Sequence, residues 1–383
     1  SFQTTREEGT RPRRAPAIYP RKPYNCLASF SIQPRFSYLC VKRKRMPPII
    51  KNISLQILNT FGIQANAQYF TEVFSEKDAI DLIRDEIRNY SKHLILGGGS
   101  NILFTGDFNG LVIHQAIKGK EIVEEDEEKC LIKVGAGEDW PSFVDYCVDR
   151  DWGGVENLAL IPGTAGAAPI QNIGAYGVEL SDVLEAVHLV HLDDGREAVL
   201  SPEACAFGYR DSVFKGALEG RVVITRLVLR LSRTPRPRLG YGDLTGRVGA
   251  SPSALEVAEA ICAIRREKLP DPAVLGNAGS FFKNPVVAAH LATRLVAAHP
   301  AMPHFPQPDG RVKLAAGWLI DQSGLKGWRQ GHFGVHGRQA LVLVHLGGGT
   351  AGELLDFAGR VTEIVSERFG VMLEREPRLV APA

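Results

Sequence analysis

The stretch that decides the fold is IPGTAGAAPIQNIGAYG, residues 161–177. Ten of its seventeen residues are Gly, Ala or Pro, which is too many for a stable helix or a central strand. Ile170, Ile173 and Tyr176 are interleaved with them, and these larger side chains favour a packed segment over a low-complexity linker. We therefore predict a loop whose backbone amides wrap closely around a flat ligand.

A second glycine-rich segment, LGGGSN at residues 96–101, directly follows an apolar strand. Glycines let backbone N–H groups approach a phosphate, and Ser100 and Asn101 can add hydrogen bonds. The segment lacks both the GxGxxG spacing of a Rossmann fingerprint and the GK[ST] of a P-loop. By itself it is equally consistent with a plain turn. Two such segments about 65 residues apart favour a dinucleotide cofactor.

Helical and strand patterns alternate along the chain from about residue 52. Apolar periodicity predicts helices at 76–90, 139–152, 253–268, 287–298, 313–323 and 350–369. Runs rich in β-branched residues predict strands at 93–96, 102–104, 110–117, 130–137, 186–192, 221–231 and 339–346. Pro235 and Pro237 interrupt the pattern and indicate a linker. We therefore expect an α+β fold with one domain at 51–234 and another at 235–383.

The first 50 residues form a basic leader. They carry 11 of the 45 Lys and Arg residues but only two acids, Glu7 and Glu8, and they lack apolar periodicity, so we expect disorder. Their composition would also suit an organelle transit peptide, but Met46 opens a stretch that looks like a natural start, which favours a translated or artificial leader. The remaining chain is mildly acidic, which does not indicate a nucleic-acid partner. No apolar run approaches the roughly 20 residues of a membrane span.

Cysteine and histidine residues give no sign of a metal site. The six cysteines contain no CxxC pair, as is typical of a reduced, cytosolic-type chain. Cys262 falls on an apolar helical face and is expected to be a small buried hydrophobe. The pairs His188/His191 and His332/His336 have plausible ligand spacings, but no carboxylate or Cys supports them, so we interpret them as structural.

Three further stretches carry candidate functional residues. FGYRDSVFK, residues 207–215, places Arg210 among aromatic residues, where a buried guanidinium needs an anion, either Asp211 or a ligand. IRREKLPDP puts Arg265, Arg266 and Lys268 at the end of a helix, where they can bind phosphate or complement the helix dipole. In GNAGSFFKNP, small residues precede Ser280, so backbone can approach its hydroxyl closely.

These stretches together resemble the UDP-N-acetylenolpyruvoylglucosamine reductase family, and its type I branch in particular. The matching segments run in family order from about residue 60 to 380: LGGGSNILF, LIPGTAGAAPIQNIGAYGVEL, FGYRDSVFK, YGDL, REKLPDP, GNAGSFFKNP, AAGWLIDQSGLKG, HGRQALVLV and FGVMLEREPRLV. The resemblance implies a FAD-binding domain of the vanillyl-alcohol-oxidase (PCMH) type at 51–234, with α+β subdomains at about 51–116 and 117–234. A smaller α+β substrate-binding domain at 235–383 would follow it.

The resemblance also implies an activity. The family reduces UDP-N-acetylglucosamine enolpyruvate to UDP-N-acetylmuramate through FAD, with NADPH as co-substrate, in the synthesis of peptidoglycan precursors. We accordingly expect a cytoplasmic, monomeric enzyme. A different flavoprotein of the same cofactor fold, such as a sugar or hydroxy-acid oxidase, would share the two glycine-rich segments but has no reason to carry GNAGSFFKNP or REKLPDP.

The residue roles carried over from the family form three sets. Arg210 and Glu376 would stabilise an enolate, and Ser280 would protonate it; Glu376 should then have a raised pKa. A slipped register would give Glu374 the role of Glu376. The FAD contacts would be Gly97, Gly98, Gly99, Ser100, Asn101, Gly163, Thr164, Ala165, Gly166, Gln171, Gly174 and Arg265. The substrate contacts would be Tyr241, Lys268, Asn284 and Gln339, with Tyr241 and Lys268 at the diphosphate.

Overall fold

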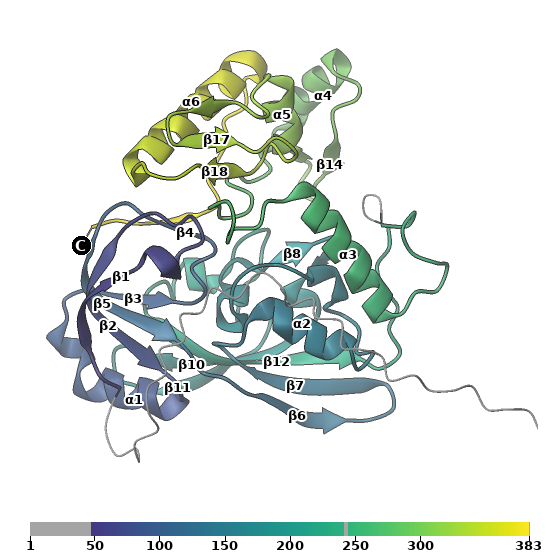
Figure 1. The fold of residues 1–383 in the computed structure, drawn as a ribbon. Coiled ribbons are helices and arrows are strands. Elements are labelled where there is room, and N and C mark those ends of the chain that lie inside the picture. Colours follow the sequence, from purple (N-terminus) through teal and green to yellow (C-terminus); the bar gives the residue numbers. More distant parts are fainter. Residues whose placement is uncertain (1–46, 241–243, 383) are drawn as a thin grey trace, which may run out of the picture.

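The structure is a computed structural model that describes residues 47–240 and 244–382. Most of the expected leader, residues 1–46, and the substrate candidate Tyr241 lie outside the described residues. Two lobes are stacked in Figure 1, the upper one formed by the C-terminal part of the chain. The last strand returns from the upper lobe to the lower one, so the two lobes are joined at two places in the chain.

The first part of the lower lobe is a four-stranded sheet in the order β1-β2-β5-β3. Strands β2 and β3 run parallel to β5, and β1 is antiparallel to β2. Helix α1 begins after Ser75, whose side chain accepts a hydrogen bond from the Asp78 amide. The elements are β1 Ile50–Ser54, β2 Asn66–Val73, α1 Glu76–Asp85, β3 His93–Leu96, β4 Ile102–Phe104 and β5 Phe108–Gln115. The helix expected at 76–90 thus ends earlier and continues as the short 3-10 helix Ile87–Asn89.

The second part of the lower lobe is a five-stranded antiparallel sheet in the order β11-β10-β12-β7-β6. Alternate residues of β7 (Cys130, Ile132 and Val134) are fully buried, which gives this strand one face toward the core. The elements are β6 Lys120–Glu125, β7 Lys129–Gly135, α2 Trp140–Val148, β8 Gly174–Ala175, β9 Val178–Glu179, β10 Leu184–His191, β11 Glu197–Leu200 and β12 Val222–Ser232.

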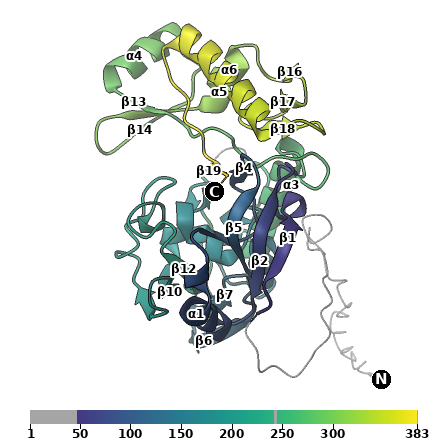
Figure 2. The same ribbon diagram turned by 90° about the vertical axis from the view of Figure 1, so that its left-hand side faces the viewer.

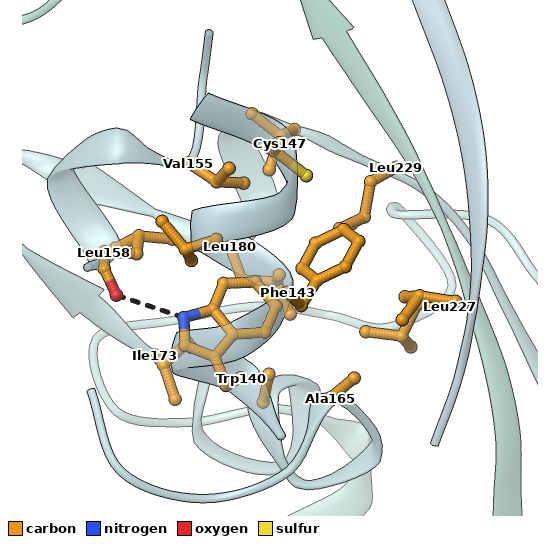
Figure 3. Packing of buried hydrophobic residues seen from close by; sticks show 14 of the residues in the cluster. Trp140, Phe143, Cys147, Val155, Leu158, Ala165, Ile173, Leu180, Leu227 and Leu229 are labelled. Atoms are coloured by element: carbon orange, nitrogen blue, oxygen red, sulfur yellow. Dashed lines mark hydrogen bonds between the residues drawn. The ribbon is translucent and has the colours of Figure 1, made fainter. Parts of the chain in front are cut away.

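Helix α2 covers the core of this sheet. Figure 3 shows Trp140 and Phe143 of α2 beside Leu227 and Leu229 of β12. The Trp140 indole N–H donates to the Leu158 carbonyl at 3.1 Å, so this large buried side chain has its polar atom satisfied. The core thereby fixes the segment that follows α2, which includes the loop at 161–177.

Helix α3, Ala254–Lys268, packs on the lower lobe, which differs from the boundary expected at residue 235. Its buried residues Val257 and Ile261 belong to the same core cluster as Trp140. Pro235 lies against Gly153, where an added Cβ would be 2.3 Å from the proline Cβ. The proline-rich segment is therefore a packed crossing, and the chain passes to the upper lobe only after α3. Cys262 is 2% exposed in this core, as expected.

The upper lobe surrounds a second core beneath helix α6. Thr350 and Glu353 form a capping box at the start of α6, and Gly370 ends it in a left-handed conformation. The helix expected at 313–323 begins only at Ala316, because residues 312–314 form a strand. The elements are β13 Val286–Val287, α4 Ala289–Ala298, β14 His304–Pro306, β15 Val312–Leu314, α5 Ala316–Gln322, β16 Arg329–Gln330, β17 Phe333–Val335, β18 Leu343–His345, α6 Ala351–Phe369 and β19 Arg378–Val380.

The pairing of β19 with β4 positions the C-terminal segment. The two strands are parallel, and the Arg378 amide donates to the Asn101 carbonyl at 3.0 Å. Figure 2 shows this C-terminal strand beside β4, between the two lobes. The residues just before β19 are therefore held next to the glycine-rich segment at 96–101.

None of the helices in the described part of the chain has the length and apolar composition to cross a lipid bilayer.

Candidate functional site

A cavity of about 620 Å³ lies between the two lobes. Both glycine-rich segments line it from the lower lobe, and residues of the segments 278–283 and 374–379 line it from the upper side. The sequence candidates on its wall are Gly97, Gly98, Gly99, Ser100, Asn101, Gly163, Thr164, Gly166, Gln171, Gly174, Arg210, Arg265, Ser280 and Glu376. The fold therefore brings most of the candidate residues to one cavity.

The two glycine-rich segments contact each other directly. A Cβ on Gly98 would lie 2.9 Å from the Gly163 Cα, so the two backbones leave no room for a side chain. The Ser100 hydroxyl donates to the Pro162 carbonyl at 2.9 Å. The Asn101 side-chain amide donates to Gln171 Oε1 at 2.5 Å. The segments thus form one paired surface, which excludes the interpretation of residues 96–101 as an unrelated plain turn.

The segment at 161–177 is more regular than the expected loop. Residues Ala165–Gln171 form a 3-10 helix, which accommodates Pro169 and ends at Asn172 in the left-handed region with a φ of 45°. Its start is fixed by two backbone bonds, from Ala165 to the Glu138 carbonyl and from Gly166 to the Ala136 carbonyl, both 2.8 Å. A short tight helix of small residues keeps the backbone close to the cavity, as the composition indicated.

Residues on the cavity wall carry buried polar atoms that have no partner among the described residues. They include Gln115 Oε1, Thr164 Oγ1 and Arg265 Nε. Gln115 donates its amide N–H to the Ile224 carbonyl at 2.8 Å, which leaves its oxygen as a pure acceptor. A buried polar atom without a partner costs about 1–3 kcal/mol. These atoms fit a bound ligand that offers both acceptors and donors, as the phosphates, hydroxyls and ring nitrogens of FAD do.

Arg210 occupies the tip of a tight turn in the lower lobe. Gly208 and Asp211 close the turn by exchanging backbone hydrogen bonds of 3.0 and 3.3 Å. Arg210 itself has a φ of 55°, in the left-handed region that non-glycine residues rarely adopt. Its Nη2 donates to the Gly174 carbonyl at 2.8 Å. The guanidinium is thereby held beside the second glycine-rich segment.

The anion beside Arg210 is Glu376 from the C-terminal segment, 3.3 Å from Arg210 Nε, whereas the Asp211 carboxylate accepts from the Ser212 amide. Burial raises the pKa of Glu376 from its ordinary value, although Arg210, Lys215 and Lys283 oppose the shift. The side chain of Glu376 is 12% exposed, whereas that of Glu374 is 73% exposed and pairs with Lys283. Of the two carboxylates, the one at 376 is thus the one enclosed with Arg210.

Ser280 follows a turn that Asn277 holds in place. The Asn277 side-chain oxygen accepts from the Gly279 amide at 2.9 Å, and Gly279 has a φ of 70°. After the serine, Phe281 is buried and accepts a hydrogen bond from the Glu376 amide on its carbonyl at 2.9 Å. The Ser280 hydroxyl has no hydrogen bond to the described residues. It therefore lies on the cavity wall beside the Glu376 backbone with its donor uncommitted within that part of the chain.

Several candidates do not line the cavity. Ala165 is fully buried behind the wall, and Lys268 is exposed at the end of α3. Asn284 accepts from the Ala316 amide at 3.0 Å and so holds the start of α5. Gln339 lies near Gly317, whose added Cβ would be 3.2 Å from Gln339 Oε1. Lys268, Asn284 and Gln339 are therefore not part of the cavity wall, unlike the catalytic candidates and most of the FAD candidates.

Some residues of the site were not among the sequence candidates. Lys215 and Lys283 line the cavity, and both stand inside stretches already singled out, FGYRDSVFK and GNAGSFFKNP. Tyr209 lies under Lys313 of the upper lobe, 4.4 Å from the ammonium to the ring centre. Nothing in the sequence around Gln115 indicated a functional role, because it is a single Gln at the end of a strand with no motif around it.

The histidine and cysteine residues that the structure describes show no metal-binding arrangement. Within residues 47–240 and 244–382, three His, Cys, Asp or Glu side chains nowhere gather closely enough to hold an ion. His332 contacts the Gly347 carbonyl through Nδ1 at 2.7 Å, and burial lowers the pKa of His188. Cys130, Cys147, Cys205 and Cys262 are buried free thiols.

The chain matches known proteins over both lobes. Residues 67–201 match the FAD binding domain model, and residues 271–380 match the model of the UDP-N-acetylenolpyruvoylglucosamine reductase C-terminal domain. UDP-N-acetylenolpyruvoylglucosamine reductases of Chromobacterium violaceum and Pseudomonas aeruginosa are 48% and 49% identical to it, each over 86% of this chain and 98% of the relative. The solved structure of the Thermus caldophilus reductase aligns with a TM-score of 0.60 at 25% identity, covering 87% of this chain and 98% of that one.

Proposed function

The chain belongs to the UDP-N-acetylenolpyruvoylglucosamine reductase family, and from this premise we propose how its residues divide the work of the reaction. The reaction is the NADPH-dependent reduction of UDP-N-acetylglucosamine enolpyruvate to UDP-N-acetylmuramate in peptidoglycan synthesis. The observation that carries this assignment is that the chain matches these reductases over nearly their whole length, in sequence and in structure.

The two paired glycine-rich segments would hold FAD. The unpartnered Thr164 hydroxyl, Gln115 oxygen and Arg265 Nε supply polar contacts to it from the cavity wall. The residues that we assign to FAD are Gly97, Gly98, Gly99, Ser100, Asn101, Gly163, Thr164, Ala165, Gly166, Gln171, Gly174 and Arg265, with Gln115 added from the structure. Bound FAD supplies a hydride, obtained from NADPH, to C3 of the enolpyruvyl group.

Arg210 and Glu376 would stabilise the negative charge that develops on the substrate. Hydride addition at C3 leaves charge at C2, delocalised into the carboxylate as an enolate. Arg210 is fixed before the reaction by Gly174 and Glu376, so it can face that charge without reorganising. A buried Glu376 with a raised pKa can be protonated and then donate a hydrogen bond to the enolate.

Ser280 would deliver the proton to C2. A serine hydroxyl is a weak acid, but an enolate carbon is a strong base, so delivery depends on position more than on acidity. The turn at Asn277 and Gly279 and the buried Phe281 leave this side chain little freedom to move away from the cavity. Its hydroxyl has no competing partner among the described residues.

We assign four further residues to contacts with the substrate: Tyr241, Lys268, Asn284 and Gln339. Lys268 is exposed in the last turn of α3, and we assign its ammonium to the diphosphate. The bond from the Ala316 amide to Asn284 Oδ1 fixes the orientation of that side-chain amide. Tyr241 lies outside the described residues and is proposed from the YGDL match alone.

Three further assignments are proposals of the same kind. We place the domain change after α3, near residue 271, in view of the core to which α3 belongs. We expect the enzyme to act as a monomer, because its candidate residues for FAD and for catalysis all come from one chain. A cytoplasmic location follows from its proposed substrates, a nucleotide sugar and NADPH.

A two-stage anaerobic experiment tests the function. The purified protein is first reduced with NADPH, and UDP-N-acetylglucosamine enolpyruvate is then added while the flavin absorbance is followed. We expect the enolpyruvyl substrate to reoxidise the flavin with formation of UDP-N-acetylmuramate. A protein that stays reduced with this substrate, but is reoxidised by oxygen after oxidising a sugar, would be an oxidase of the same cofactor fold.

A further inference from the structure

Lys215 folds back onto the turn that carries Arg210. It ends the short 3-10 helix Val213–Lys215 and lines the cavity. Its ammonium donates to the Arg210 carbonyl at 2.9 Å. The two backbone hydrogen bonds that close the turn use Gly208 and Asp211, so they leave this carbonyl to Lys215.

The conformation of Arg210 requires such support. With a φ of 55°, the residue occupies the left-handed region, which is unfavourable for a side chain without special constraints. Conformations of this kind persist where surrounding contacts fix them, and they cluster at functional sites. Here the conformation points the guanidinium toward both the Gly174 carbonyl and Glu376.

Lys215 is held among charges of both signs. Burial lowers the pKa of its ammonium, and Lys283 acts in the same direction, while Asp211, Glu376 and Glu374 oppose the shift. Placing an ammonium in a partly buried cavity is unfavourable unless its contacts compensate. The hydrogen bond to the Arg210 carbonyl is such a contact, and it ties the ammonium to the turn that carries Arg210.

We propose that Lys215 is a positioning residue that locks the backbone of Arg210 in its left-handed conformation and so aims the guanidinium at the enolpyruvyl substrate. The inference rests on the role proposed above for Arg210. Without the ammonium, the Arg210 carbonyl loses its partner and the residue can relax toward a negative φ. The guanidinium of Arg210 would then move away from Glu376. The enolpyruvyl substrate would lose the cation that faces its developing negative charge.

The first test compares the two half-reactions of Lys215→Met in stopped-flow experiments. NADPH should reduce the bound FAD at a rate within about twofold of the unaltered enzyme, because this step produces no enolate. Reoxidation by UDP-N-acetylglucosamine enolpyruvate should slow by about tenfold or more. Lys215→Arg, which keeps a charged donor, should recover part of the loss. Lys77→Met, at an exposed ion pair with Asp81, is the matched control and should change neither rate.

A double-mutant cycle with Arg210→Ala separates positioning from other effects. If Lys215 acts through Arg210, Lys215→Met should slow reoxidation no further in the Arg210→Ala background. An equal loss in both backgrounds would overturn the positioning role while leaving the function of Arg210 intact. An unchanged rate for Arg210→Ala alone would instead contradict the proposed function. If the Met variant fails to hold FAD, the same cycle with Lys215→Gln decides between these outcomes.

Discussion

Arg210 Nε lies 3.3 Å from Glu376 Oε1, although the two residues come from different parts of the fold. Arg210 stands on a turn of the lower lobe, and Glu376 stands two residues before the strand β19, which pairs with β4 beside the first glycine-rich segment. The pairing of β19 is therefore what brings the carboxylate to the guanidinium. Both side chains belong to residues that line the cavity between the lobes.

The pH dependence of Glu376→Gln tests whether the carboxyl acts protonated. Burial raises the pKa of Glu376, so its protonated form persists to a higher pH than for an ordinary glutamate. Reoxidation of the reduced enzyme should slow as pH rises through this pKa. A neutral Gln donor cannot titrate, so the variant should lack this decline. A rate that rises with pH through the same pKa would mean that the ionised carboxylate is the working form.

The raised pKa of Glu376 should also make the stability of the folded protein fall as pH rises. A raised pKa in the folded state means that the folded chain binds the proton more tightly than the unfolded chain. This contribution to stability is present below the unfolded pKa and is lost as pH rises through the folded pKa. Denaturant unfolding of the FAD-free protein should show Glu376→Gln gaining stability relative to the unaltered chain as pH increases. A difference that is constant with pH would contradict the raised pKa.

Thr164→Val should have opposite effects on the protein with and without its cofactor. The buried Thr164 hydroxyl has no partner among the described residues, so removing it should raise the unfolding free energy of the FAD-free protein by about 1 kcal/mol. If FAD is its partner, the FAD dissociation constant should rise by about tenfold. Titration of FAD-free protein with FAD measures this constant.

Thr71→Val is the matched control for this experiment. The Thr71 hydroxyl is also buried without a partner among the described residues, but it stands on β2 away from the cavity wall. Its removal should stabilise the protein and leave FAD affinity unchanged. Equal FAD affinities for both variants would remove Thr164 from the cofactor site.

Gly98→Ala should abolish tight FAD binding through backbone displacement. The added Cβ would lie 2.9 Å from the Gly163 Cα, and neither backbone can move without separating the two glycine-rich segments. Gly359→Ala is the contrasting change, because this exposed glycine of α6 has nothing within 4 Å of an added Cβ. We expect it to stabilise the fold by about 0.5–1 kcal/mol. Flavin content after purification and thermal unfolding measure the two effects.

Local composition was enough to predict the two glycine-rich segments and the helices, but not which parts of the fold they would contact. The density of small residues at 161–177 and 96–101 identified both segments that pair at the cavity wall, because close backbone approach needs such residues in any fold. Helix α3 was assigned to the wrong lobe, since an apolar stripe such as Val257 and Ile261 shows that a helix is buried but not against which core.

The site depends on long-range pairing that a local pattern does not encode. The register between β19 and β4 determines that Glu376, and not Glu374, is enclosed with Arg210. Lys215 was visible in the sequence, but its role depends on the left-handed conformation of a residue five positions earlier. Gln115 became a candidate only when its buried oxygen was found without a partner among the described residues.

The central claim, that Ser280 protonates the substrate on the cavity side enclosed by Arg210 and Glu376, is tested most directly by separating the half-reactions of Ser280→Ala. NADPH should reduce the variant at the normal rate, because no proton is delivered to C2 in that step. Anaerobic addition of UDP-N-acetylglucosamine enolpyruvate should then reoxidise it about a hundredfold or more slowly than the unaltered enzyme. Ser323→Ala, whose hydroxyl donates to the Leu319 carbonyl on α5 and does not line the cavity, should behave normally. Normal reoxidation of Ser280→Ala would contradict the account.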